Sequence, residues 1–284
     1  MKFSLSTNWC NRRIESGEEI ADKAMELGFD ELELGYHTTL LQAKGFKARL
    51  DQIPVGSVHA FCPVPISAPQ GYPELYQLAT FDEEGRKMAR LQVERNIRFA
   101  AEMGADTLVL HAGRVMSDGW LFPSRRLRRR VKRGRKMVDV FKRELDALVP
   151  ALERNKVVLG LENLPYLEGF PAEWEMSDIV GDWVKPWLDT GHDLVRKVSR
   201  WEAEAVEIIQ GEDAFLPPPL QPVGLHVADS LGGDDHLAPG EGRVDFAALK
   251  PLARAARHIV FEPNAGVGEE DLRQGIARIA SLWS

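Results

Sequence analysis

The sequence predicts a (β/α)8 barrel, in which a closed ring of parallel strands is covered by helices. Short apolar or alternating runs recur along the 284 residues, and a helical pattern follows most of them. Eight units of about 35 residues follow one another without a linker, which fits this barrel in length and rhythm. No Gly-rich phosphate-binding turn follows the first run, so a doubly wound open sheet is the weaker alternative. We therefore expect a single barrel domain over residues 1–284.

The first half of the chain supplies four strands. The segment ELELG alternates leucine with glutamate, the period of a strand with two unlike faces. The helical pattern before it ends at Gly28, a residue that readily takes the left-handed conformation after a helix. The predicted strands of this half are 2–7, 31–35, 55–61 and 106–111, and the predicted helices are 17–27, 40–50 and 82–103. A Pro-rich loop over 62–79 is too long for a mere connection and is a candidate lid.

The second half supplies the other four strands. The runs KVVLGLE and HIVFE are short, apolar and rich in β-branched residues, as buried parallel strands are. The predicted strands of this half are 156–162, 185–189, 222–228 and 258–262, and the predicted helices are 123–152 and 269–283.

Composition limits the class of protein. The chain is 44% hydrophobic and 28% charged, with 36 basic and 43 acidic residues and a net charge of −7. It has no long apolar run that could span a membrane and no N-terminal apolar segment of signal length. Only Cys10 and Cys62 are present, which excludes a disulfide framework and fits the cytoplasm. The acidic balance gives no general attraction to nucleic acid or to a membrane, and we expect neither as a partner.

Titratable side chains stand where the predicted strands end, and they include five of the seven histidines. They are His59, His111, Glu162, Asp189, His192, His226, Asp234, His236 and Glu262. The carboxyl ends of barrel strands meet at one face, where active sites lie. A single member could be a turn or a helix cap, but burying so many together without a cation would be costly. Carboxylates and imidazoles are ligands of divalent metals, so the pattern predicts a metal site.

Four segments carry a family resemblance: LEN (161–163), LDTGHD (188–193), LHVADSLGGDDHLAPGEGRVDF (225–246) and FEP (261–263). With them, nearly the whole chain resembles the sugar phosphate isomerase/epimerase family. That family lies in the xylose isomerase-like barrel superfamily, which also contains endonuclease IV. The longest segment is the most specific, whereas LEN and FEP are weak by themselves.

The epimerase branch of this resemblance implies one divalent cation (Mn, Zn, Mg or Co) held by Glu162, Asp189, His226 and Glu262. Glu162 and Glu262 would move protons on opposite sides of a bound ketose, and His192 would contact a substrate hydroxyl. The endonuclease IV branch implies three metals, and its added ligands would be His59, His111, His192, Asp234 and His236. All nine positions are filled, so the ligand set does not choose between the branches.

Three functions follow as hypotheses. The first is a metal-dependent isomerase or epimerase of a sugar or sugar phosphate, which transfers protons through a metal-stabilised enediolate. The second is a zinc phosphodiesterase that acts on abasic DNA, and the third is a barrel that binds a metal or sugar without catalysis. The acidic composition and the LDTGHD segment favour sugars. The oligomeric state is not readable from the sequence, although a homodimer is one expectation.

A basic run, RRLRRRVKRGRK, occupies residues 125–136 and could bind the phosphate backbone of DNA. Its charges would fall all round a helix, which favours a solvated surface as the simpler interpretation. Arg243 lies in the Gly-rich turn and could meet a substrate hydroxyl or phosphate, and Trp9 could stack on a sugar ring. Asn8 and Arg114 are pocket candidates by position alone.

Overall fold

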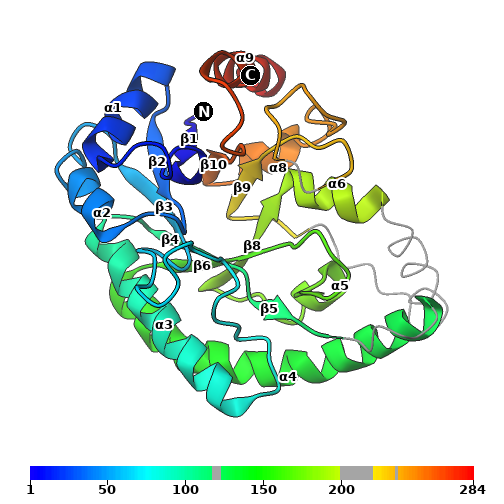
Figure 1. The fold of residues 1–284 in the computed structure, drawn as a ribbon. Coiled ribbons are helices and arrows are strands. Elements are labelled where there is room, and N and C mark those ends of the chain that lie inside the picture. The colour runs from blue at the N-terminus through cyan, green and yellow to red at the C-terminus, as the bar shows by residue number, and fades with distance from the viewer. Residues whose placement is uncertain (117–122, 199–219, 234–235) are drawn as a thin grey trace.

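The computed structural model describes residues 1–116, 123–198, 220–233 and 236–284, and Figure 1 shows its barrel. Eight parallel strands close the ring in the order β1-β10-β9-β8-β6-β4-β3-β2. They are β1 (Ser4–Ser6), β2 (Glu31–Leu34), β3 (Val55–His59), β4 (Thr107–Leu110), β6 (Val158–Glu162), β8 (Val184–Asp189), β9 (Gly224–Val227) and β10 (His258–Phe261). The predicted fold class is confirmed, and each predicted strand overlaps one of these eight.

Helices surround the ring in Figure 1. They are α1 (Gly17–Leu27), α2 (Leu40–Lys47), α3 (Glu83–Glu102), α4 (Pro123–Asn155), α5 (Glu173–Met176), α6 (Thr190–Val198), α8 (Lys250–Ala255) and α9 (Glu269–Trp283), with a 3-10 turn η1 (Thr7–Trp9) after β1. Local caps set several ends. The hydroxyl of Ser16 accepts a hydrogen bond from the backbone N–H of Glu19, and Gly28 ends α1 in the left-handed conformation. α4 continues three residues beyond the predicted end, with Pro150 inside it.

A small second sheet lies outside the ring. β5 (Gly113–Arg114) pairs antiparallel with β7 (Gly169–Phe170), so it joins the segments that follow β4 and β6. The sequence did not predict it, because two residues are too few to show a period.

The indole of Trp187, from β8, occupies part of the interior of the ring. The side chain packs with Val109 and Val260 as a separate apolar cluster, and only 1% of it is exposed. A Cβ atom on Gly224 would lie 2.2 Å from the indole, and one on Gly160 would lie 3.0 Å away. These two glycines therefore make the room that the ring system needs. The larger apolar core lies between the barrel and the helices.

Within the described ranges, every helix is too short or too polar to cross a bilayer.

Candidate metal centre

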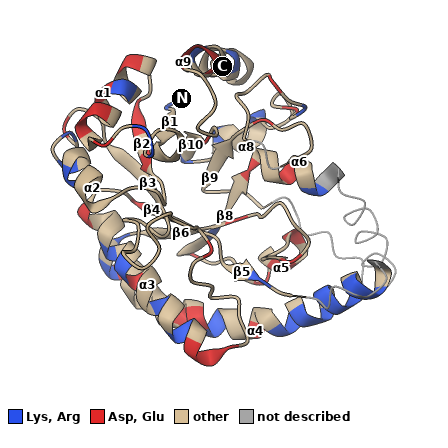
Figure 2. Ribbon diagram, viewed as in Figure 1, with Lys and Arg blue, Asp and Glu red and all other residues tan. Residues whose placement is uncertain are grey.

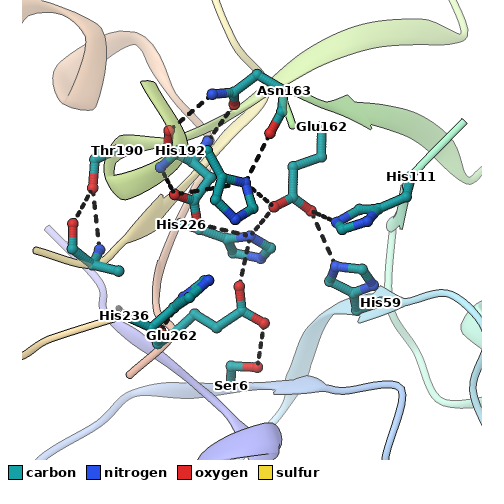
Figure 3. A network of polar contacts seen from close by, with 12 residues as sticks. Ser6, His59, His111, Glu162, Asn163, Thr190, His192, His226, His236 and Glu262 are labelled. Atoms are coloured by element: carbon teal, nitrogen blue, oxygen red, sulfur yellow. Dashed lines mark hydrogen bonds and ion pairs between the residues drawn. The ribbon is translucent and has the colours of Figure 1, made fainter. Parts of the chain in front are cut away.

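The candidate site is built around one nitrogen atom, Nδ1 of His226, at the carboxyl end of β9. It lies 3.0 Å from Oε2 of Glu262 and 3.2 Å from Oε1 of Glu162. Oδ2 of Asp189 is 3.9 Å away. These four residues are buried, and their potential ligand atoms all lie within 4.8 Å of one another. Figure 3 shows the side chains of Glu162, His226 and Glu262 pointing toward one another.

Each of the two glutamates has one oxygen held by the scaffold and one that faces His226. Oε2 of Glu162 is 3.0 Å from Nε2 of His59 and 3.1 Å from Nε2 of His111. Oε1 of Glu262 accepts a hydrogen bond from the Asn8 amide at 3.0 Å. Anchoring one oxygen fixes the direction of the other, so both carboxylates are presented to the same point.

Asp189 and His226 follow the same pattern. Oδ1 of Asp189 accepts the backbone N–H of His192 at 2.7 Å, which caps the first turn of α6 and leaves Oδ2 facing the site. Nε2 of His226 lies 3.1 Å from Oε1 of Glu33, so Nδ1 is the nitrogen that faces the carboxylates. The backbone of Asp189 is fixed by Asn163, whose amide oxygen accepts its N–H at 2.6 Å.

The polar atoms at the centre fit a cation. Among the described residues, Oε1 of Glu162, Oδ2 of Asp189 and Nδ1 of His226 are buried and make no hydrogen bond of acceptable geometry. Burying a polar atom without a partner is costly, so three such atoms that face one point indicate that a binding partner belongs there. Three carboxylates and one imidazole suit a divalent ion that is hard or borderline in its ligand preference.

Four further histidines surround this group. His59, His111 and Glu162 form one possible ligand cluster, and Asp189, His192 and His236 form another. Each shares a carboxylate with the central four. The rings of His192 and His236 meet edge to face, with centroids 5.2 Å apart. All the predicted site histidines are therefore in one assembly, whereas Asp234 lies outside the described residues.

The charges of the site depend strongly on one another. Burial alone would lower the pKa of His111, but the carboxylates of Glu162 and Glu74 outweigh it and raise the pKa to about 9. Burial likewise opposes the charged form of His226, yet Glu262, Glu33 and Glu162 raise its pKa well above the usual range. Burial would raise the pKa of Glu162, and the cationic forms of His111 and His226 hold it well below normal instead. Glu162 thus stays ionised and attracts positive charge.

The Gly-rich turn after β9 is organised by Asp229, which explains part of the long sequence motif. Oδ1 of Asp229 accepts the backbone N–H groups of Ser230 and Val244, and Oδ2 accepts that of Gly240. Gly240 has φ of +111°, which L side chains rarely adopt, and a Cβ on Gly242 would lie 2.3 Å from Oδ1 of Asp229. The turn carries His236, whose Nδ1 lies 2.9 Å from the backbone oxygen of Glu262.

Two acidic residues of the assembly were missed from the sequence. Glu33 of β2 is fully buried and contacts His226. Glu74, from the loop over 62–79, places Oε1 3.8 Å from Nδ1 of His111, an ion-pair rather than a hydrogen-bond distance, and its other oxygen pairs with Arg114. The guanidinium of Arg114 also lies over the ring of Tyr166, with 4.0 Å to the centroid.

Two residues predicted to bind substrate have other surroundings. Trp9 is 2% exposed and belongs to the large apolar core, and its indole N–H donates to the backbone oxygen of Val267 at 2.8 Å. These contacts account for Trp9 as a packing residue of the core, and its stacking on a sugar ring stays a prediction. Arg243 is exposed, and its backbone N–H donates to the oxygen of Ser230. Its role in substrate binding stays a prediction.

The basic run lies in the first half of α4, where Figure 2 shows its lysines and arginines. The interpretation that it is only a solvated surface is wrong at Arg130, which is fully buried and pairs with Glu175. Arg130 also donates to the backbone oxygens of Leu167 and Gly169, and Arg126 pairs with Glu168. These arginines tie α4 to the segment that follows β6.

Comparison with solved structures gives matches along nearly the whole chain. A D-tagatose 3-epimerase-like protein is 21% identical, with a TM-score of 0.67, and the alignment covers 99% of this chain and 97% of that one. The 3-keto-D-glucoside 4-epimerase YcjR from E. coli is 20% identical, with a TM-score of 0.67 and 99% of both chains covered. The IOLI protein with a bound zinc atom is 15% identical, with a TM-score of 0.65 and coverage of 100% and 98%.

Identities this low establish the fold and not the activity. No curated protein matches the sequence significantly. The model of one protein family matches residues 21–282, which is most of the chain, and the chain therefore belongs to the xylose isomerase-like TIM barrel family.

Proposed function

We propose that this protein is a divalent-metal-dependent isomerase or epimerase that acts on a sugar or sugar phosphate. The observation that carries the proposal is the placement of two glutamates about one point. Oε1 of Glu162 and Oε2 of Glu262 both lie close to Nδ1 of His226, and each is presented by an anchored partner oxygen. The epimerases among the structural neighbours act on sugars by their titles, which supports the same substrate class here.

Glu162, Asp189, His226 and Glu262 would hold the cation, which we expect to be Mn, Zn, Mg or Co. A bound divalent cation would polarise a sugar carbonyl and the neighbouring hydroxyl and so make the adjacent C–H more acidic. One glutamate then removes that proton to give an enediolate, and the other returns a proton to the opposite face or the adjacent carbon. A carboxylate that also binds the cation is a weak base, so the acidity of the C–H must supply most of the driving force.

His192 is placed to contact a substrate hydroxyl in this arrangement. Its Nδ1 lies 2.9 Å from the backbone oxygen of Asn163 and 3.4 Å from Oε1 of Glu162. The backbone contact orients the ring beside Glu162, where a substrate hydroxyl would lie.

The test is exchange of a ketose C–H proton with solvent deuterium. We would load the protein with Mn²⁺, incubate it in deuterated buffer with a panel of ketoses and ketose phosphates, and follow deuterium by mass spectrometry. The proposal expects metal-dependent incorporation beside the carbonyl of at least one sugar. The double variant Glu162→Gln/Glu262→Gln is the matched control and should incorporate none. Absence of exchange across the panel in the metal-loaded wild type would contradict the proposal.

A second candidate is a zinc phosphodiesterase that acts on abasic DNA, and one observation favours it. Two of the further ligand clusters share Glu162 or Asp189 with the central four residues, an arrangement that suits several neighbouring zinc ions. The discriminating measurement is metal content by elemental analysis, together with nicking of an abasic duplex. About three zinc ions per chain with salt-sensitive nicking would support this candidate, and about one ion without nicking would support the first.

A further inference from the structure

Glu33 lies inside the barrel on β2, on the opposite side of His226 from the candidate metal centre. Both of its carboxylate oxygens approach Nε2 of His226, at 3.1 and 3.2 Å. The hydroxyl of Ser57 donates to Oε2 of Glu33 at 2.8 Å. All three side chains have no exposed surface. Both carboxylate oxygens of Glu33 therefore approach the same nitrogen, Nε2 of His226.

The sheet is built to bring Glu33 and Ser57 together. In the pairing of β2 with β3, Leu32 is opposite Val55, whereas Glu33 is opposite Ser57. The register shift leaves Gly56 without a partner and places the serine hydroxyl beside the carboxylate. β1 and β10 lie between β2 and β9 in the ring, so the contact from Glu33 to His226 crosses the interior of the barrel.

Two other rings restrain the imidazole of His226 but cannot choose its protonated nitrogen. His59 stacks on it with centroids 5.6 Å apart and an interplanar angle of 7°. Trp187 meets it edge to face, with centroids 5.1 Å apart. These contacts hold the plane of the ring, yet neither presents a hydrogen-bond acceptor to Nε2. The carboxylate of Glu33 presents an acceptor to Nε2.

We infer that Glu33 is a positioning residue, which holds the proton on Nε2 of His226 and thereby directs the lone pair of Nδ1 toward the cation. The tautomer follows from the hydrogen-bond network, because an ionised carboxylate only accepts. A carboxylate behind a ligating histidine fixes the ring orientation and increases the basicity of the ligating nitrogen. The inference rests on the metal centre of the proposed function and adds a residue that the four-ligand set does not contain.

The test measures cation binding directly and does not need a substrate. Zn²⁺ or Mn²⁺ alone is titrated into the metal-free protein in competition with a chromophoric chelator. Glu33→Leu removes the acceptor and should weaken binding by about 10- to 100-fold. Glu33→Gln keeps an oxygen that can accept the Nε2 proton but loses the charge, so its loss should be smaller. Glu31→Gln is the matched control, since Glu31 lies on the same strand and pairs with Lys2 away from the site, and its affinity should equal that of wild type.

A spectroscopic readout separates positioning from a general structural role. In the Zn²⁺-loaded protein labelled with 15N, the imidazole nitrogens of His226 should show a protonated Nε2 and a metal-bound Nδ1. Glu33→Gln should keep that pattern, and Glu33→Leu should lose the protected Nε2 proton. If Glu33→Leu fails to fold, Ser57→Ala takes its place, with a smaller loss of affinity than the leucine variant would give.

Wild-type affinity in Glu33→Leu, or in both Glu33→Gln and Ser57→Ala, would overturn the inference. Failure of the proposed function looks different. Suppose that the wild type binds the cation, that the Glu33 variants bind it more weakly, and that no sugar exchanges a proton. That result would support the positioning role of Glu33 and contradict the proposed sugar activity. A wild type that binds no divalent cation would overturn both.

Discussion

Oε1 of Glu162 lies 3.2 Å from Nδ1 of His226, although β8 separates their strands in the ring. Glu162 would act as a base as well as a metal ligand, whereas His226 would only bind the metal. Because Glu262 approaches the same nitrogen, the two glutamates are related through His226. If a reaction uses both glutamates, replacing either one should slow turnover, whereas exchange of the substrate C–H proton should depend on which glutamate is replaced.

Single replacement of the two glutamates should separate proton removal from proton return. Glu162→Gln and Glu262→Gln should each slow epimerisation or isomerisation by about 10²- to 10⁴-fold, the usual contribution of a positioned acid or base. For a given sugar, one of them should retain exchange with solvent deuterium, because one base still reaches the C–H. Product formation by chromatography and deuterium uptake by mass spectrometry provide the two rates. Equal loss of exchange in both single variants, each shown by elemental analysis to have the cation bound, would contradict a two-base reaction.

Metal stoichiometry should depend on His236 in only one of the two candidate functions. With a single ion held by the central four residues, His236→Ala should leave about one equivalent bound, because His236 belongs to the cluster of Asp189 and His192 instead. With several ions, the same variant should lower the number bound. Elemental analysis of protein dialysed after loading measures this, and Arg243→Ala, an exposed change in the same turn, is the control.

Loss of Arg130 should destabilise the fold. Its guanidinium lies 2.6 Å and 2.9 Å from the two oxygens of Glu175, and both side chains are buried. Arg130→Ala leaves the carboxylate buried without its counter-ion, so the free energy of unfolding should fall by about 3–5 kcal/mol in urea titration. Arg128→Ala, at an exposed position of the same run, should change it by less than about 0.5 kcal/mol. Replacing both partners, as Arg130→Met/Glu175→Leu, should recover part of the loss.

Stability should fall at low pH partly because of Asp106, at the end of the barrel opposite the site. Burial alone would raise the pKa of Asp106, but hydrogen bonds from His258 and Thr107 and the charge of Arg257 lower it to about 2. A lowered carboxyl pKa stabilises the fold above the pKa of the unfolded chain, and this contribution is lost as pH falls from about 4 toward 2.

Urea unfolding of wild type and Asp106→Asn should therefore differ most near about pH 6, and the difference should shrink across that window. The exposed Asp51→Asn is the comparison variant. A difference that stays constant with pH would show that the charge of Asp106 is not responsible.

The ring of strands was predictable because each strand carries a local period or an apolar run. Glu33 was not, and the reason is geometric. In ELELG the alternation assigns the leucines to one face and the glutamates to the other, and such a polar face normally meets water. In a closed barrel Leu32 and Leu34 pack beneath the helices, and the glutamate face turns toward the interior. The partner of Glu33 is on β9, and no local pattern reveals a contact across the ring.

Arg130 shows a signal that sequence reasoning could have used. It lies three residues after Leu127 and four before Gly134, on the buried face of α4. A Cβ on Gly134 would come within 1.6 Å of the Glu175 carboxylate, so the glycine makes space for the ion pair. A glycine inside a long basic helix thus marks a close approach, whereas the charge pattern alone indicated a surface.

The indole of Trp187 determines the route by which anything reaches His226. That ring packs against Val109 and Val260 and lies between the rings of His226 and His258, so we expect ions and ligands to enter from the carboxyl end of the strands. The route we expect passes the side of the site where Glu74 approaches His111. Substitutions at the amino-terminal end of the barrel, around Asp106 and Glu31, should accordingly change the stability of the fold. The rates of ligand binding and release should stay the same.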